Sequence, residues 1–279
     1  MQASSSWRGI VLVDFFLDID GTILPFGKDI PKSALDAFSE AKALGHKIFF
    51  ATGRSQAEIT PTLASLGFDG GVYSAGATVI YKDKVIYERY LNEKEKSYVF
   101  EFASEHKLDL VVQTEEATYM HSSTYELWKE LFLHYIGLEI AIGNLVVSDT
   151  FPDSLVLKKL VIFSRDGMIS KAREDLDKAF TIVGNTVGLP QSIMAELVLS
   201  DITKATGIEH MINYLGDKRE STVAIGDGPN DIEMIEYASI GIAMGNGCEE
   251  LKSKADYITT DIENDGLKNA FSYAINKLC

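Results

Sequence analysis

The fold is decided by the stretch VLVDFFLDIDGT at residues 11–22. From Val11 to Ile19 it is mostly apolar and β-prone, and it ends at Asp20-Gly21. A strand buried inside a parallel sheet is typically a short apolar run, because helices cover both of its faces. The stretch therefore predicts a buried parallel strand that feeds a loop at its carboxyl end.

Helix and strand patterns alternate after this strand. They predict a helix at 31–44, a strand at 47–51, a helix at 55–66 and a strand at 71–74. Pro31 suits the first turn of one helix, and Ser55 suits the N-cap of the next. The β-α-β-α-β order implies an α/β fold, a Rossmann-like parallel-sheet core with right-handed crossovers.

The rhythm changes after residue 81. Hairpins and helices are mixed there, with patterns typical of helices at 93–105, 125–136 and 169–179. The first rhythm returns with a helix at 203–215. We thus expect an α+β unit inserted into the core. The expected division is a discontinuous core at 10–81 and 192–279, an inserted domain at 82–191, and a loose N-terminal segment at 1–9.

Composition limits the class of protein. The net charge of −15 disfavours nucleic acid and anionic lipid as partners. No apolar run approaches the roughly 20 residues that span a membrane, and residues 10–17 lack a cleavage site of the signal-peptide type. Two cysteines are too few for a disulfide framework, so a reducing cytoplasm is expected. The sequence indicates no protein partner.

Two aspartates follow the first strand. Asp18 and Asp20 are two residues apart, and this spacing allows both carboxylates to point to one side. One can attack phosphorus while the other supplies a proton to the leaving oxygen. The alternative is a solvated Asp-Gly turn.

Two further segments can bind phosphate. In residues 51–55, ATGRS, the hydroxyl of Thr52 and the free N–H groups at the start of the next helix can both bind phosphate oxygens. Lys204, at the start of the helix 203–215, can offset charge on a transferring phosphoryl group. The alternatives are an ordinary strand-to-helix turn and a solvated surface lysine.

A fourth segment suits a metal ion. Residues 226–231, GDGPND, follow a predicted strand and place two carboxylates and an amide in a tight loop. Oxygen ligands of this kind suit Mg²⁺. The alternative is an Asp-Gly-Pro-Asn turn in which Asp231 caps the next helix.

Together and in this order, the four segments resemble the haloacid dehalogenase-like (HAD) hydrolase superfamily. The long interval between Thr52 and Lys204 resembles the Cof-like branch, whose α/β cap lies between the second and third motifs. Residues 241–246, GIAMGN, and 255–259, ADYIT, are also similar to this branch. The resemblance implies a HAD-like core with a large cap.

The resemblance also implies roles. Asp18 would be the nucleophile that becomes phosphorylated, and Asp20 the general acid and then the base that activates water. The phosphate-binding residues would be Thr52, Gly53, Lys204 and Asn230. The metal residues would be Asp18, Asp20 through its backbone carbonyl, Asp227, and Asp231 directly or through water. The cofactor would be Mg²⁺.

The expected activity is magnesium-dependent hydrolysis of phosphorylated small molecules, with sugar phosphates first. One alternative is a phosphomutase, although Arg89, Arg165 and Arg173 of the inserted unit form no cluster in the sequence. Another is a non-catalytic phosphate sensor, which would be expected to lose Asp18 or Asp20. No cap residue is assigned to the site. An aromatic stripe that includes Trp128, Phe132 and Tyr135 is predicted to be the buried face of one helix.

Overall fold

The computed structural model describes residues 12–114, 116–135, 144–152, 154–184 and 189–278. The predicted loose segment 1–9 lies outside the described residues, as do the first residue of the predicted strand 11–19 and the last residue of the predicted helix 125–136.

The first sheet has eight strands in the order β14-β13-β12-β1-β2-β3-β4-β5. Their bounds are β1 Asp14–Leu17, β2 Lys47–Ala51, β3 Gly70–Tyr73, β4 Thr78–Tyr81, β5 Lys84–Glu88, β12 Thr222–Gly226, β13 Ile240–Ala243 and β14 Tyr257–Ile258. The strands from β14 to β3 pair in parallel, and β4 and β5 extend the sheet as an antiparallel hairpin. The predicted parallel core is confirmed.

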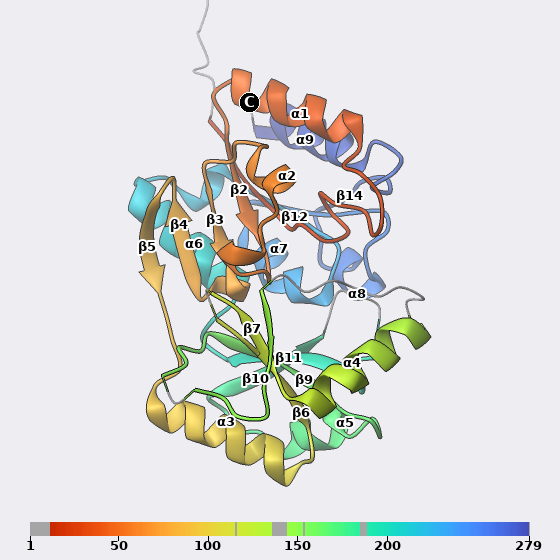
Figure 1. Cartoon of the computed structure of the whole chain (residues 1–279). Coiled ribbons are helices and arrows are strands. Elements are labelled where there is room, and N and C mark those ends of the chain that lie inside the picture. The colour runs from red at the N-terminus through yellow and green to blue at the C-terminus, as the bar shows by residue number, and fades with distance from the viewer. Residues whose placement is uncertain (1–11, 115, 136–143, 153, 185–188, 279) are drawn as a thin grey trace, which may run out of the picture.

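Helices cover both faces of this sheet (Figure 1). They are α1 Lys32–Ala43 and α9 Gly266–Leu278 on one face, and α6 Lys204–Leu215 and α7 Ile232–Tyr237 on the other. Neighbouring residues of β1 serve the two faces: Phe15 stacks on Phe271 of α9, and Phe16 stacks on Phe49 within the α6–α7 layer. Successive side chains of a strand alternate between faces, which explains why this strand is apolar throughout.

The second sheet has six strands in the order β10-β11-β9-β6-β7-β8. Their bounds are β6 Asp109–Gln113, β7 Thr118–Met120, β8 Leu145–Val147, β9 Lys159–Phe163, β10 Phe180–Gly184 and β11 Met194–Leu199. The helices α3 Glu93–Glu105 and α5 Ile169–Ala172 cover one face, and α4 Ser122–Tyr135 covers part of the other. This α+β unit, below the core in Figure 1, is the cap.

The predicted helix at 55–66 is wrong. The segment forms a short 3₁₀ helix, η1 Gln56–Glu58, and then one turn of α-helix, α2 Pro61–Ala64. Proline lacks an N–H group and favours an extended residue before it, and Thr60 has the extended ψ of 157°. Thr60 caps the new turn instead, because its side chain accepts a hydrogen bond from Leu63 N.

Two other helices differ from expectation. The predicted helix at 169–179 ends as α5 at Ala172 and continues only as a 3₁₀ turn, η3 Arg173–Asp175. In α4, Trp128 and Phe132 are buried as predicted, whereas Tyr135 is 43% exposed. The remaining elements are α8 Glu249–Lys252, η2 Ser74–Gly76, η4 Arg219–Ser221 and η5 Pro229–Asp231.

The sheets to which β5 and β11 belong indicate where the chain crosses between the core and the cap. β5, at residues 84–88, pairs within the first sheet, and β11, at residues 194–199, pairs within the second. The two crossings between the sheets thus follow β5 and β11, later than the proposed borders at 81/82 and 191/192. The division into 10–81, 82–191 and 192–279 stays a proposal.

Hydrogen bonds join the two parts beside the first of these crossings, the one that follows β5. Leu91 N donates to Leu157 O at 2.7 Å. Lys158 Nζ donates to Thr78 Oγ1 at 2.5 Å and to Glu88 Oε1 at 2.7 Å, both on the core hairpin. The cap is therefore anchored to the core just before β9.

None of the helices in the described ranges combines the length and the apolar character that a bilayer crossing demands.

Candidate active site

The predicted site residues lie at the carboxyl edge of the core sheet. Strand β1 pairs with β12 on one side and with β2 on the other. Asp18, Thr52 and Asp227 each follow one of these three strands. The carboxyl ends of adjacent parallel strands meet at one edge, and ligands bind there in open α/β sheets.

Lys204 lies at the centre of this edge. It is the first residue of α6, and only 1% of its side chain is exposed. Its Nζ donates to Asp18 Oδ1 at 2.6 Å and to Asp231 Oδ1 at 2.5 Å. A buried ammonium group requires such partners, so the alternative of a solvated surface lysine is excluded.

Three carboxylates surround this lysine. One oxygen from each of Asp18, Asp227 and Asp231 lies within 4.8 Å of the other two. Burial raises the pKa of Asp18 well above its usual range; Lys204 opposes this shift, and the charges of Asp231 and Asp227 add to it. Burial, reinforced by Asp231, raises the pKa of Asp227 to about 7. Three acids against one lysine leave an excess of negative charge in this cluster.

This donor set fits a divalent cation. Asp18 Oδ2 is buried and has no hydrogen-bond partner within the described ranges of the chain. Mg²⁺ prefers carboxylate oxygens and binds through one or two of them together with substrate phosphate. The residues present are thus suited to hold the metal that the sequence implies.

Neighbouring groups fix the other two carboxylates. Asp231 Oδ2 accepts from the N–H groups of Asp227 and Gly228, each at 2.9 Å. Thr22 Oγ1 donates to Asp227 Oδ1 at 2.8 Å. Gly21 has φ +87°, and a Cβ there would lie 2.2 Å from Asp227 Oδ2, so glycine is required. Both oxygens of Asp231 already accept hydrogen bonds, which favours its indirect role beside the metal.

Asp20 lies outside the 4.8 Å cluster and has a different partner. Arg54 Nε donates to Asp20 Oδ2 at 2.8 Å, and Arg54 Nη2 donates to Asp20 Oδ1 at 2.6 Å. Arg54 Nη1 also donates to Glu58 O at 3.2 Å. Since both oxygens accept from the guanidinium, Asp20 must leave Arg54 before either oxygen can take part in proton transfer.

The remaining predicted residues lie at the same edge. Thr52 is 1% exposed, and its Oγ1 accepts from Arg54 N at 3.1 Å. Asn230 is 8% exposed, and its Oδ1 is buried without a hydrogen-bond partner in the part of the chain that the structure describes. Gly53 faces the cap, where Lys159 Nζ lies 3.3 Å from the position that a Cβ would occupy.

Sequence reasoning gave no role to several residues of this site. Thr22 and Arg54 lie inside the motif stretches, and their side chains hold the predicted acids. Lys159 and Glu196 lie in cap strands. The available signal was a charged residue inside a strand otherwise built from buried apolar residues.

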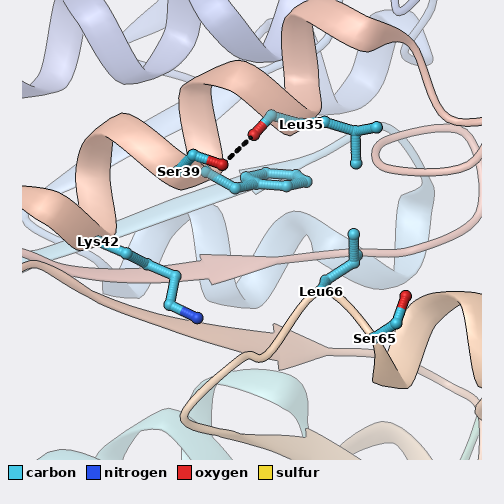
Figure 2. A pocket seen from close by; sticks show the side chains of 6 residues that line it. Leu35, Ser39, Lys42, Ser65 and Leu66 are labelled. Atoms are coloured by element: carbon cyan, nitrogen blue, oxygen red, sulfur yellow. Dashed lines mark hydrogen bonds between the residues drawn. The ribbon is translucent and has the colours of Figure 1, made fainter.

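A surface groove elsewhere on the core is a weaker candidate (Figure 2). Its volume is about 360 Å³, and it lies between α1 and the end of α2. It is lined by Leu35, Phe38, Ser39, Lys42, Ser65 and Leu66. Ser39 Oγ donates to Leu35 O, and Lys42 Nζ donates to Gly67 O. None of the predicted site residues lines it.

Comparison with known proteins agrees with this geometry. The family model described as haloacid dehalogenase-like hydrolase matches residues 15–271. The chain belongs to this family. The HAD-like fold and the family predicted from the four motifs are thereby confirmed.

Relatives and solved structures narrow the assignment. The Bacillus subtilis protein YkrA, which carries a provisional phosphatase name, is 31% identical over 94% of this chain and 96% of its own. The 5-amino-6-(5-phospho-D-ribitylamino)uracil phosphatase YitU of the same organism is 26% identical over 92% and 96%. A solved HAD subclass IIB sugar phosphatase has 27% identity and a TM-score of 0.77, covering 96% of this chain and 100% of that one. The chain is a HAD-family phosphatase of the Cof-like branch.

Proposed function

We propose that this HAD phosphatase hydrolyses phosphate monoesters of small metabolites, with sugar and polyol phosphates first, through a phosphorylated Asp18 and with Mg²⁺ as cofactor. The observation that carries the proposal is the pair of bonds from Lys204 to Asp18 and Asp231 inside the carboxylate cluster. In this arrangement Asp18 can act as the nucleophile and Lys204 as the cation that binds the phosphoryl group. The three carboxylates also have more oxygen atoms than Lys204 binds, and these can ligate a metal ion.

The first half of the proposed reaction transfers the phosphoryl group. An oxygen of Asp18 forms a bond to phosphorus, and the bond from phosphorus to the leaving oxygen breaks. Asp20, once released from Arg54 and protonated, gives its proton to the leaving oxygen. Lys204, Thr52, Asn230 and the N–H groups of the loop at Gly53 hold the phosphoryl oxygens.

The second half restores the enzyme. Asp20, now a carboxylate, takes a proton from water as the water oxygen bonds to phosphorus. The bond between phosphorus and Asp18 breaks, and inorganic phosphate leaves. Asp20 stays released from Arg54 in this step and returns to the bidentate contact after the phosphate has left.

The metal residues are Asp18, Asp227, the backbone carbonyl of Asp20, and Asp231 through its support of the loop. Bound Mg²⁺ would offset the charge of the phosphate dianion and of the neighbouring carboxylates.

The proposed substrate class is supported by the names of two relatives. YitU is named for a substrate with a phosphorylated ribityl chain, and the solved relative is described as a sugar phosphatase. A phosphomutase would require a second phosphate clamp in the cap. The cap arginines have other partners: Arg89 pairs with Glu95, Arg173 donates to Ile182 O, and Arg165 is half exposed near Glu130. Hydrolysis is therefore favoured over isomerisation.

The test of the metal is direct. Phosphate release from p-nitrophenyl phosphate and from a panel of sugar and polyol phosphates is measured with Mg²⁺ and with chelator. We expect chelation to lower the rate at least about a hundredfold and added Mg²⁺ to restore it. A rate that is unaffected by chelation contradicts the metal assignment.

Asp20→Asn tests the acid–base role. Steady-state turnover should fall by about 10²–10⁴-fold, because the activation of water is lost for every substrate. p-Nitrophenol is a good leaving group and needs no proton, so this variant should release a burst of one equivalent per protein before slow turnover. Asp36→Asn, on the exposed face of α1, is the matched control. Turnover of Asp20→Asn at the wild-type rate would refute the role.

A further inference from the structure

Three polar side chains share one face of the cap sheet. Gln113 of β6 lies opposite Lys159 of β9 in the sheet register. Glu196 of β11 lies opposite Val161, which is two residues from Lys159 and so shares its face. Lys159 Nζ donates to Glu196 Oε1 at 2.9 Å, and these side chains are 5% and 14% exposed. A buried polar group thus spans three strands.

Apolar residues lie next to this polar group on β6, β9 and β11. Val111, Val161, Phe163 and Met194 pack there against Trp128 and other residues of α4. Each of the three strands has an apolar residue at one end of this face and a polar residue at the other. The pairs are Val111 and Gln113 in β6, Val161 and Lys159 in β9, and Met194 and Glu196 in β11. One end of the face is therefore covered by a helix, and the other end carries the polar group.

The polar end faces the proposed phosphate loop. A Cβ at Gly53 would lie 3.3 Å from Lys159 Nζ and 3.4 Å from Glu196 Oε1. Gln113 Nε2 donates to Glu58 Oε1 at 3.0 Å, in the turn that follows this loop. The three cap residues thus lie against the segment that is proposed to hold the phosphoryl group, on the side where a leaving group would extend toward the cap.

Two oxygen atoms of this group are unsatisfied. Among the described residues, Glu196 Oε2 and Gln113 Oε1 are buried and have no hydrogen-bond partner. Both are acceptors, and a buried acceptor without a donor costs free energy. The charge of Lys159 is already paired with Glu196, so little positive charge remains for a second anion.

We propose that Gln113, Lys159 and Glu196 form the leaving-group subsite, and that it takes an uncharged polyhydroxylated group whose hydroxyls donate to Glu196 Oε2 and Gln113 Oε1. This proposal rests on the proposed phosphatase function. The subsite would make the enzyme prefer sugar and polyol phosphates as substrates. A second phosphate or a carboxylate on the leaving group would be disfavoured, because Glu196 Oε2 and Gln113 Oε1 are both acceptors. Lys159 keeps the Glu196 carboxylate in place.

The test compares leaving groups of equal length. The ratio of kcat/KM for ribitol 5-phosphate to that for pentyl phosphate is measured with Mg²⁺ for the wild type, Glu196→Ala, Glu196→Gln and Gln113→Ala. The two substrates differ only in their hydroxyls. We expect a wild-type ratio above about ten, a drop of the ratio toward one in Glu196→Ala, and smaller drops in the two other variants.

Glu101→Ala, on the exposed face of α3 in the cap, is the matched control and should keep the wild-type ratio. Equal losses on both substrates would mean that Glu196 has only a structural role and would overturn the subsite. Wild-type turnover of both substrates at equal efficiency would leave the phosphatase intact and refute the subsite alone. A wild type that hydrolyses neither these compounds nor p-nitrophenyl phosphate would refute the proposed function, and the subsite with it.

Discussion

The two ends of β1 carry the same arrangement of charges. A buried aspartate bonds to a lysine at each end, and that lysine bonds to a second aspartate. The amino end has Asp14, Lys47 and Asp217, and the carboxyl end has Asp18, Lys204 and Asp231. Only the second set is proposed to carry out chemistry, so the pattern of acid, lysine and acid does not by itself identify an active site.

Exposure and charge balance separate the two ends. Lys47 is 25% exposed and Lys204 is 1% exposed. At the carboxyl end a third carboxylate, Asp227, joins the cluster, and Asp18 Oδ2 is buried with no partner among the residues that the structure describes. The amino end has two carboxylates for one lysine and lies near solvent. The carboxyl end has three carboxylates for one lysine and, among the described residues, an acceptor without a partner, and these features support the proposed Mg²⁺ site.

The largest expected difference between the two ends is in activity. Asp18→Asn removes the proposed nucleophile and should lower phosphate release on the order of a thousandfold or more for every substrate. Asp14→Asn, four residues away on the same strand, should keep the rate within about threefold, because Asp14 lies far from the carboxyl edge. Equal losses in both variants would remove the distinction.

Stability should separate the two lysines. Lys204→Met leaves the buried carboxylates without a positive charge and should lower the free energy of unfolding by roughly 3–5 kcal/mol. Lys47→Met should cost only about 1 kcal/mol, because Lys47 and Asp217 reach solvent. Urea denaturation of both variants with chelator present measures the difference. A larger loss for Lys47→Met would contradict the charge balance described above.

The smallest effect concerns pH. Burial raises the pKa of Asp14 from 3.8 to about 6, against the influence of Lys47. The folded state therefore binds this proton more tightly than the unfolded state does, so the stability from protonated Asp14 is present below pH 4 and lost as the pH rises through 6. The free energy of unfolding of the wild type, relative to Asp14→Asn, should fall by roughly 2–3 kcal/mol over this range.

Denaturation curves of the two proteins at pH 4, 5, 6 and 7 provide this comparison. The raised pKa values of Asp18 and Asp227 are common to both proteins and cancel in the difference. A difference that rises with pH would mean that Lys47, rather than burial, controls Asp14.

The sequence predicted the core better than the cap. Residues near Asp18, Thr52, Lys204 and Asp227 lie in short contiguous motifs, and the parallel sheet brings those motifs together through its topology alone. The structure places their side chains at one edge, although their catalytic roles stay proposals. Pairings inside the motifs, such as Arg54 with Asp20, could not be predicted, because side-chain direction depends on the loop conformation.

The cap subsite could not be found in the same way. Gln113, Lys159 and Glu196 come from three strands, and only the register shows that they share a face. The domain borders could not be predicted from the sequence pattern either. β5 and β11 have ordinary strand sequences, and only their pairing partners decide which sheet each one joins. The helix predicted at 55–66 failed for a local reason, the break imposed by Pro61.

Lys158 and Lys159 are consecutive residues whose side chains contact different parts of the core. Lys158 binds the core hairpin at Thr78 and Glu88, and Lys159 lies over Gly53. The cap is thus held to the core directly beside the proposed phosphate loop, and any opening that keeps the bonds of Lys158 must pivot there.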